Sequence, residues 1–226
     1  MIALLTAALF TLQNEELAEA SKKSAALENY AFKVETKLSK GKNQPGAVEG
    51  KVQKDQPTSL KEGSTEAFRK GGQIVYKEGE EWKKLEKAAK GEKKSQPAAA
   101  EFAGLKLPHE ELESFDKSFE KVEKAADKDK GCTVWSGSLT PTAAKVLVST
   151  GSKREGKVQA SYAGTAKVWV NDAGLIVRYE VVSTVKAETK KGPQETTVTK
   201  TVEISAPGET KVEVPEAVAK LLGSQS

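Results

Sequence analysis

Apolar and polar residues alternate along several stretches of the chain, and this alternation is typical of strands in a sheet with one wet face. Residues 30–38 show it first: Tyr30, Phe32 and Val34 fall on one face, while lysines and glutamates fall on the other. Successive side chains of a strand point to opposite faces, so a period of two predicts a half-buried strand. The same kind of pattern predicts further strands at 48–53, 66–70, 73–77, 81–85, 133–139, 157–171, 175–188, 194–205 and 211–214.

Turn chemistry predicts that the three long strands of the C-terminal half are joined as hairpins. Asp172, Ala173 and Gly174 separate the first two of these strands, and Lys-Lys-Gly-Pro at 190–193 separates the second from the third. Glycine beside Asp or Pro favours a tight reversal of the chain, because glycine adopts the positive φ angles that such turns need. The C-terminal half is therefore predicted to be an antiparallel meander.

Apolar residues at steps of three and four predict helices over 14–28, 108–126 and 141–149, and Pro215 begins a fourth helix. The face of the second helix would carry Leu112, Phe115, Phe119 and Val122. Long antiparallel strands with one wet face must cover the other face, and the helices are the available cover. The predicted fold class is therefore α+β, a strongly curved antiparallel sheet wrapped around a few helices.

The chain divides into a short apolar start and one predicted domain. Residues 2–12 are apolar apart from two threonines, too few to span a bilayer but suited to the h-region of an export signal. The alternative is that they form a buried first helix. We expect residues 1–12 to be this signal-peptide h-region and 13–226 to be a single domain, interrupted at 86–100 by a mobile loop rich in lysine and alanine.

Composition argues against most kinds of catalysis. Hydrophobic residues make up 37% of the 226 residues and charged residues 30%, which predicts a thin core and a well-solvated surface. The single Cys132 and the single His109 exclude an intramolecular disulfide and the usual zinc sites. Lysine alternates with glutamate and arginine occurs three times, so nucleic acid is not an expected partner. We expect no enzyme, no metal and no cofactor.

The order of elements resembles that of a known superfamily. Four segments are the basis of this resemblance. In the first, LENYAFKVETKL, an aromatic residue after a helix opens the first long strand. The others are the hairpin NDAGLIVRYEVVSTVKAE and the segments ETTVTKTVEIS and KVEVPEAVAKLL. Together they are similar to the periplasmic lipoprotein carriers, the LolA-like and LppX-like half-barrel proteins. The loop at 86–100 and the helix at 108–126 have no counterpart, and no lipobox cysteine follows the apolar start.

The resemblance implies an open half-barrel whose concave face forms an apolar cavity for lipids or acyl chains. The partner would be a lipid or an acylated protein, and the protein would be a monomeric carrier or sensor, periplasmic or otherwise exported. Lysines in the loop at 86–100 would add weak contact with an anionic membrane surface. The cavity lining would come from the apolar strand faces: Tyr30, Phe32, Val34, Ile74, Tyr76, Trp82, Trp135, Tyr162, Val168, Val177, Tyr179 and Val181.

Two alternatives stay open at the level of the sequence, and one further residue has a single expectation. The same strand residues could form an ordinary filled core, which would favour a protein-interaction module of the same fold. Trp169 lies on the opposite face of its strand from Val168. It would be either an exposed aromatic residue that contacts a partner or a membrane, or a ring packed beneath a loop. His109 follows Pro108 among several acids and is expected to be a surface histidine.

Overall fold

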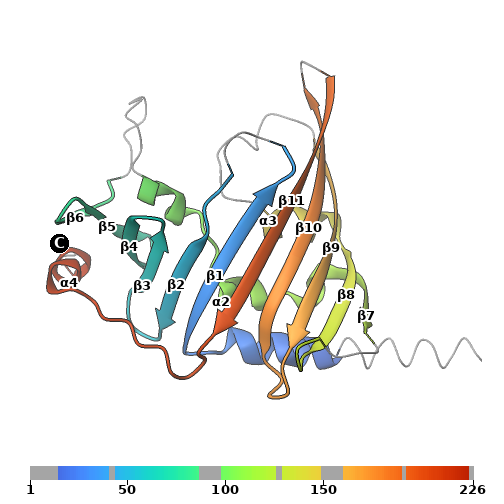
Figure 1. Cartoon of the computed structure of the whole chain (residues 1–226), viewed down its shortest axis with the longest axis horizontal. Coiled ribbons are helices and arrows are strands. Elements are labelled where there is room, and N and C mark those ends of the chain that lie inside the picture. The colour runs from blue at the N-terminus through green and yellow to red at the C-terminus, as the bar shows by residue number, and fades with distance from the viewer. Residues whose placement is uncertain are drawn as a thin grey trace, which may run out of the picture.

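The computed structural model of the chain describes residues 15–40, 44–86, 98–125, 129–148, 160–189 and 192–223. These residues form one antiparallel sheet of eleven strands in the order β6-β5-β4-β3-β2-β1-β11-β10-β9-β8-β7 (Figure 1). β6 and β7 are its two edges, so the sheet stays open. The strands are β1 (Asn29–Leu38), β2 (Val48–Gln53), β3 (Thr58–Glu62), β4 (Thr65–Lys70), β5 (Gln73–Glu78), β6 (Glu81–Lys84), β7 (Phe119–Lys124), β8 (Thr133–Leu139), β9 (Ala160–Val170), β10 (Ile176–Thr189) and β11 (Gly192–Ser205).

Helices and short helical turns cover the inner, concave face of the sheet. They are an N-terminal helix over 15–25, the 3₁₀ turn η1 (Ala98–Ala103), the short helix α2 (Pro108–Leu112), the 3₁₀ turn η2 (Asp116–Ser118) and the helix α3 (Pro141–Val148). The predicted α+β half-barrel, a curved antiparallel sheet around a few helices, is confirmed.

The central strand pair joins the two ends of the chain. β1 pairs with β11 from Ala31↔Ser205 to Leu38↔Val198, so the first strand of the chain lies between β2 and the last strand. The predicted alternation determines which face is buried: Tyr30, Phe32 and Val34 are all under 5% exposed, with half-buried residues between them. The long-strand meander of the C-terminal half is also observed as predicted, with β9, β10 and β11 in antiparallel register.

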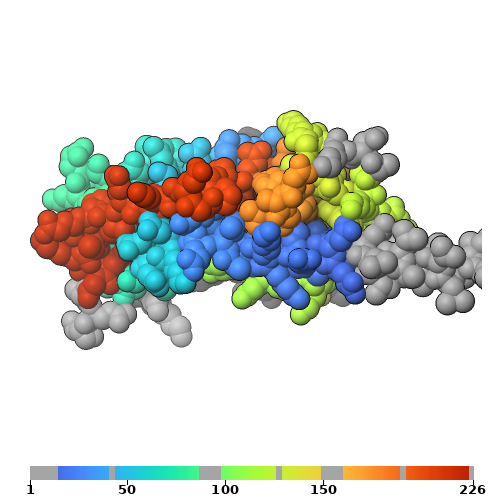
Figure 2. Space-filling view, turned by 90° about the horizontal axis from the view of Figure 1, so that it is seen from below, coloured from blue at the N-terminus to red at the C-terminus, as the bar shows by residue number. Residues whose placement is uncertain are grey.

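A last helix, α4 (Glu216–Gly223), covers the opposite, convex face at the other end of the sheet. Residues 206–215 run from the end of β11 along the lower end of the sheet to reach it (Figures 1 and 2). There α4 contacts β5 and β6. We call the apolar group formed here the convex cluster: Phe68, Val75, Val212, Val218 and Leu222, with Trp82, Val214 and Leu221 beside them.

The prediction of a helix over 108–126 is correct only for its first residues, Pro108–Leu112, and is wrong for the rest. The chain forms only α2 and η2 and then pairs as the edge strand β7 with β8. A bulge between Phe119 and Lys121 shifts the register of β7, and this brings Val122 back to the inner face, where it is 2% exposed. The sequence pattern placed the same apolar residues inside, but pairing with β8 decides the backbone conformation.

Two other strand predictions need correction. Residues 211–214 are extended but belong to no ladder; the backbone N–H of Val212 donates instead to the side-chain Oε1 of Gln53, at 2.8 Å. The strand β3 was missed, although Thr58 and Leu60 are buried on one face. Its five residues show only two inward positions, which is too short a run for a clear alternation. The expected mobile loop at 86–100 and the apolar start at 1–12 fall mostly or wholly outside the described residues.

Candidate ligand-binding face

The structure brings ten of the twelve predicted lining residues together on the concave face. We call the apolar group there the concave core. Two residues are half-buried against it, Tyr76 and Tyr162. Eight are buried within it: Tyr30, Phe32, Val34, Ile74, Trp135, Val168, Tyr179 and Val181.

Two predicted lining residues lie elsewhere. Trp82 belongs to the convex cluster, where its ring meets that of Phe68 edge-on at a centroid distance of 5.4 Å. Val177 lies in neither group, because an irregularity in the β9–β10 register between Ile176 and Arg178 places Ile176 in the concave core instead. The strict period of two assumed for 175–188 does not hold at this point.

Side chains from the covering elements fill much of the concave face. Phe102 of η1, Leu112 of α2 and Phe115 next to η2 are each no more than 1% exposed. The ring of Phe115 lies 5.0 Å from that of Tyr179, centroid to centroid. The apolar strand surface is thus in contact with protein side chains from residues 98–118, which we call the concave cover.

A buried charged pair joins this cover to the middle of the sheet. Lys200 of β11 forms an ion pair with Glu111 of α2, and their side chains are 8% and 3% exposed. The hydroxyl of Tyr179 donates to the other carboxylate oxygen of Glu111, at 2.6 Å. Burial, with the nearby Glu111 charge, raises the pKa of Tyr179 well above its ordinary value, so this phenol keeps its proton as a donor.

Sequence reasoning missed this pair, although one signal was present. Lys200 occupies an inward position of β11, between Val198 and Val202, where the alternation calls for an apolar residue. Glu111 looked like an ordinary acid in the first turn of a helix, where it would complement the helix dipole. A lysine at an inward strand position indicates that a buried anion accompanies it.

A second polar contact joins α2 to β1. The backbone N–H of His109 donates to the hydroxyl of Tyr30 at 3.3 Å, and this hydroxyl lies 2.6 Å from His109 Nδ1. A hydroxyl that already accepts one proton can donate its own to Nδ1, provided that Nδ1 is unprotonated. Burial lowers the pKa of His109, which favours this neutral form. His109 is therefore half-buried and bonded, and not the surface histidine that was expected.

Arg69 of β4 makes the third contact between sheet and cover. Its guanidinium donates to the backbone carbonyls of Phe102 and Leu105, at 3.3 and 2.5 Å. It also lies 3.6 Å from the carboxylate of Glu110. The concave cover is consequently held by polar side chains from four strands, β1, β4, β10 and β11, which belong to both halves of the sheet.

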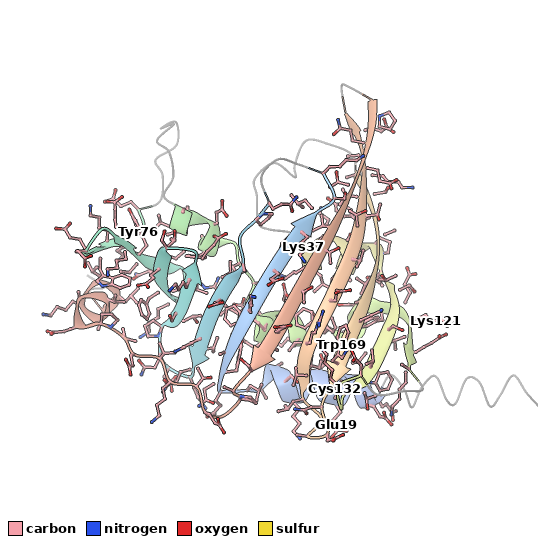
Figure 3. All side chains as sticks on the ribbon, viewed as in Figure 1. Glu19, Lys37, Tyr76, Lys121, Cys132 and Trp169 are labelled. Atoms are coloured by element: carbon pink, nitrogen blue, oxygen red, sulfur yellow. The ribbon has the colours of Figure 1, made fainter. Side chains whose placement is uncertain are left out.

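Trp169 lies on the convex side of β9 and is half-buried (Figure 3). Its indole N–H donates to the carboxylate of Asp129 at 2.8 Å, and the guanidinium of Arg178 lies 4.7 Å from its ring centroid. Its partners therefore come from the segment before β8 and from β10. Of the two alternatives, packing against a loop describes it better than free exposure.

Two surface grooves are lined wholly by described residues, and neither contains a predicted lining residue. One, of about 410 Å³, lies between the end of β1 and residues 44–47. The other, of about 550 Å³, lies where β9, β10 and β11 extend beyond their neighbours.

The part of the chain that the structure describes holds no group of His, Cys, Asp and Glu side chains that could bind a metal ion. Within that same part, every helix is too short or too polar to cross a membrane.

The fold is an open half-barrel, and the comparison with solved structures agrees. The chain is similar to LprF from Mycobacterium bovis, with a TM-score of 0.55 and 13% identity over 91% of this chain and 96% of LprF. A LolA superfamily protein from Nitrosomonas europaea also matches, over 88% of this chain and 94% of its own, with 8% identity and a TM-score of 0.30. No protein-family model and no curated protein matches the sequence. The likeness to LprF confirms the predicted half-barrel fold.

Proposed function

We propose that this protein is a non-enzymatic, exported lipid-binding protein, a carrier or sensor that holds an acyl chain against the concave face of its sheet. The observation that carries the proposal is the construction of the concave cover. Between Ala98 and Ser118 it consists of two 3₁₀ turns and a helix of five residues. Such short elements have little stability of their own and depend on the surface they cover.

This construction allows the cover to move without unfolding the sheet. The eleven-stranded ladder is complete without residues 98–118. If the cover moves outward, the apolar strand faces of the concave core become available to an acyl chain. Each methylene removed from water contributes about 0.8 kcal/mol, so a chain of a dozen methylenes could offset the loss of contacts with the cover.

A second candidate function is supported by the same packing. Trp135, Tyr30, Tyr179, Phe102 and Phe115 are all no more than 2% exposed, so the concave face is well filled as it stands. A filled core suits a protein-interaction module, in which edges or loops of the sheet would bind another exported protein.

The test between them is direct. One sample of the purified protein would be extracted with organic solvent and the extract examined by mass spectrometry. A second sample, freed of lipid under native conditions, would be titrated with a fluorescent fatty acid. We expect a bound lipid or saturable uptake of the probe. A protein that carries no lipid and takes up no probe would contradict the carrier proposal and favour the interaction module.

A further inference from the structure

We propose that the concave face carries an anion site for the head of the ligand, formed by Lys200, Tyr179 and Ser183, and that the carboxylate of Glu111 occupies this site in the present structure. The ligand class is an anionic amphiphile, an acyl chain with a carboxylate or phosphate head. This inference rests on the proposed lipid-binding function and specifies the ligand of the same face.

The first support is the position of Lys200. It lies opposite Val181 on β10 and between Val198 and Val202 along β11, all apolar neighbours on the inner face. A buried ammonium group is costly unless an anion accompanies it, and an apolar side chain of similar volume would serve the fold at least as well. The lysine is therefore better explained by the anion that it attracts than by packing.

The second support is a buried hydroxyl group without a hydrogen-bond partner, on a residue that is a diagonal neighbour of Lys200. Ser183 of β10 is completely buried, and its Oγ has no hydrogen-bond partner among the described residues. It pairs with Val198, so it is a diagonal neighbour of Lys200 across β10 and β11 on the inner face. A buried hydroxyl without a partner is costly, and the head of a bound ligand would give it one.

The third support is the resemblance of the cover to such a ligand. The carboxylate of Glu111 accepts from both Tyr179 and Lys200, as a fatty-acid head would. The residues that follow, Leu112 and Phe115, lie on the apolar strand surface where an acyl chain would lie. The cover thus presents an anionic head followed by an apolar segment, and it would compete with a ligand of the same pattern.

The experiment compares ligands that differ only in the head. Tetradecanoic acid, tetradecanol, dimyristoyl phosphatidylglycerol and dimyristoyl glycerol would each compete with a fluorescent neutral lipid on the full chain. We expect each anionic lipid to bind at least about tenfold more tightly than its neutral counterpart, the difference that one charge-assisted contact supplies. If only the acid or only the phospholipid shows the preference, that result identifies the head as a carboxylate or a phosphate.

Variants then assign the preference to the site. The double variant Lys200→Met/Glu111→Leu removes the charged pair as a unit, so it should fold and should bind each anionic lipid no more tightly than that lipid's neutral counterpart. Ser183→Ala should weaken binding of the anionic lipid several-fold, and Glu111→Gln should strengthen it, because the amide competes less well for Lys200. Lys37→Met, which removes an exposed lysine on the opposite face (Figure 3), is the matched control and should change nothing.

The outcomes separate this inference from the function on which it rests. Equal affinity within both pairs in the unmodified protein, acid against alcohol and phospholipid against diacylglycerol, would overturn the anion site and leave lipid binding intact. A preference that survives in the double variant would also overturn it. Binding of none of the four lipids would overturn both the site and the proposed function.

Discussion

The sheet is covered on its two faces in different ways. On the convex face, α4 is held by the apolar side chains of the convex cluster. On the concave face, the cover combines apolar contacts with three polar anchors, which centre on Glu111, His109 and Arg69. Apolar contacts are non-directional, whereas polar anchors must be satisfied in one geometry.

This difference indicates what each cover is for. Buried polar contacts add little net stability compared with apolar residues of the same volume, but they define one docked position and cost much when half of a pair is lost. α4 is therefore built to stay in place. Under the proposed function, the concave cover would occupy one position and would leave it when a ligand replaces its anchors.

The largest effect should come from the apolar part of the concave cover. Phe115→Ala would leave a cavity next to Tyr179 and Phe119, whose rings it now contacts at 5.0 and 5.6 Å. We expect a loss of about 4 kcal/mol in the free energy of unfolding, measured by urea denaturation. Phe115→Leu, which keeps most of the volume, should cost much less. Equal losses from both variants would mean that the lost ring contacts, and not the cavity volume, determine the loss.

The next effect tests the charged anchor. Lys200→Met alone would leave Glu111 buried without its cation and should cost roughly 3 kcal/mol. Adding Glu111→Leu should recover most of that loss, because an apolar pair replaces the ion pair as a unit. A double-mutant cycle by chemical denaturation would give the coupling between the two side chains. Additive losses would show that the pair is not coupled and that the concave cover has no charged anchor.

A smaller effect should come from the convex cover. Val218 is fully buried in α4, and Val218→Ala should lower the free energy of unfolding by about 2 kcal/mol. The affinity for lipids should not change, because α4 lies on the other face from the concave core. Ala219→Ser, at an exposed position of the same helix, is the control. A change in lipid affinity in Val218→Ala would show that the two covers are coupled through the sheet.

The sequence was sufficient to predict those parts of the fold in which the local pattern of apolar residues agrees with the tertiary environment. β2 and β8 have the bounds that the alternation predicts, and the eight buried lining residues lie where the period of two places them. The prediction failed where pairing with a distant strand overrides the local pattern, as in β7, or where a bulge changes the phase, as at Val177.

The polar anchors were harder to predict because each needs a partner from far along the chain. Glu111 and Lys200 are 89 residues apart, and Tyr30 and His109 are 79 apart. Nothing in the local pattern distinguishes Glu111 from Glu110, which remains largely exposed. The partner of a buried charge depends on the packing of the sheet, and the single available hint was the lysine at an inward position of β11.

The smallest predicted effect concerns pH and the anchor at His109. Burial lowers the pKa of His109 in the folded protein and Arg69 lowers it further, while Glu110 and Glu113 act in the opposite direction. In the unfolded chain the imidazole takes up its proton at about pH 6.5, before the folded protein does. The free energy of unfolding should therefore be constant at higher pH and decline as the pH falls through about 6.5. Thermal denaturation between pH 8 and pH 5.5 would measure this decline.

His109→Gln keeps an acceptor for Tyr30 but does not titrate, so its stability should be flat over that interval, whereas Val218→Ala should keep the decline. An unchanged decline in His109→Gln would mean that carboxylates elsewhere cause it, and that the contact between α2 and β1 does not respond to pH.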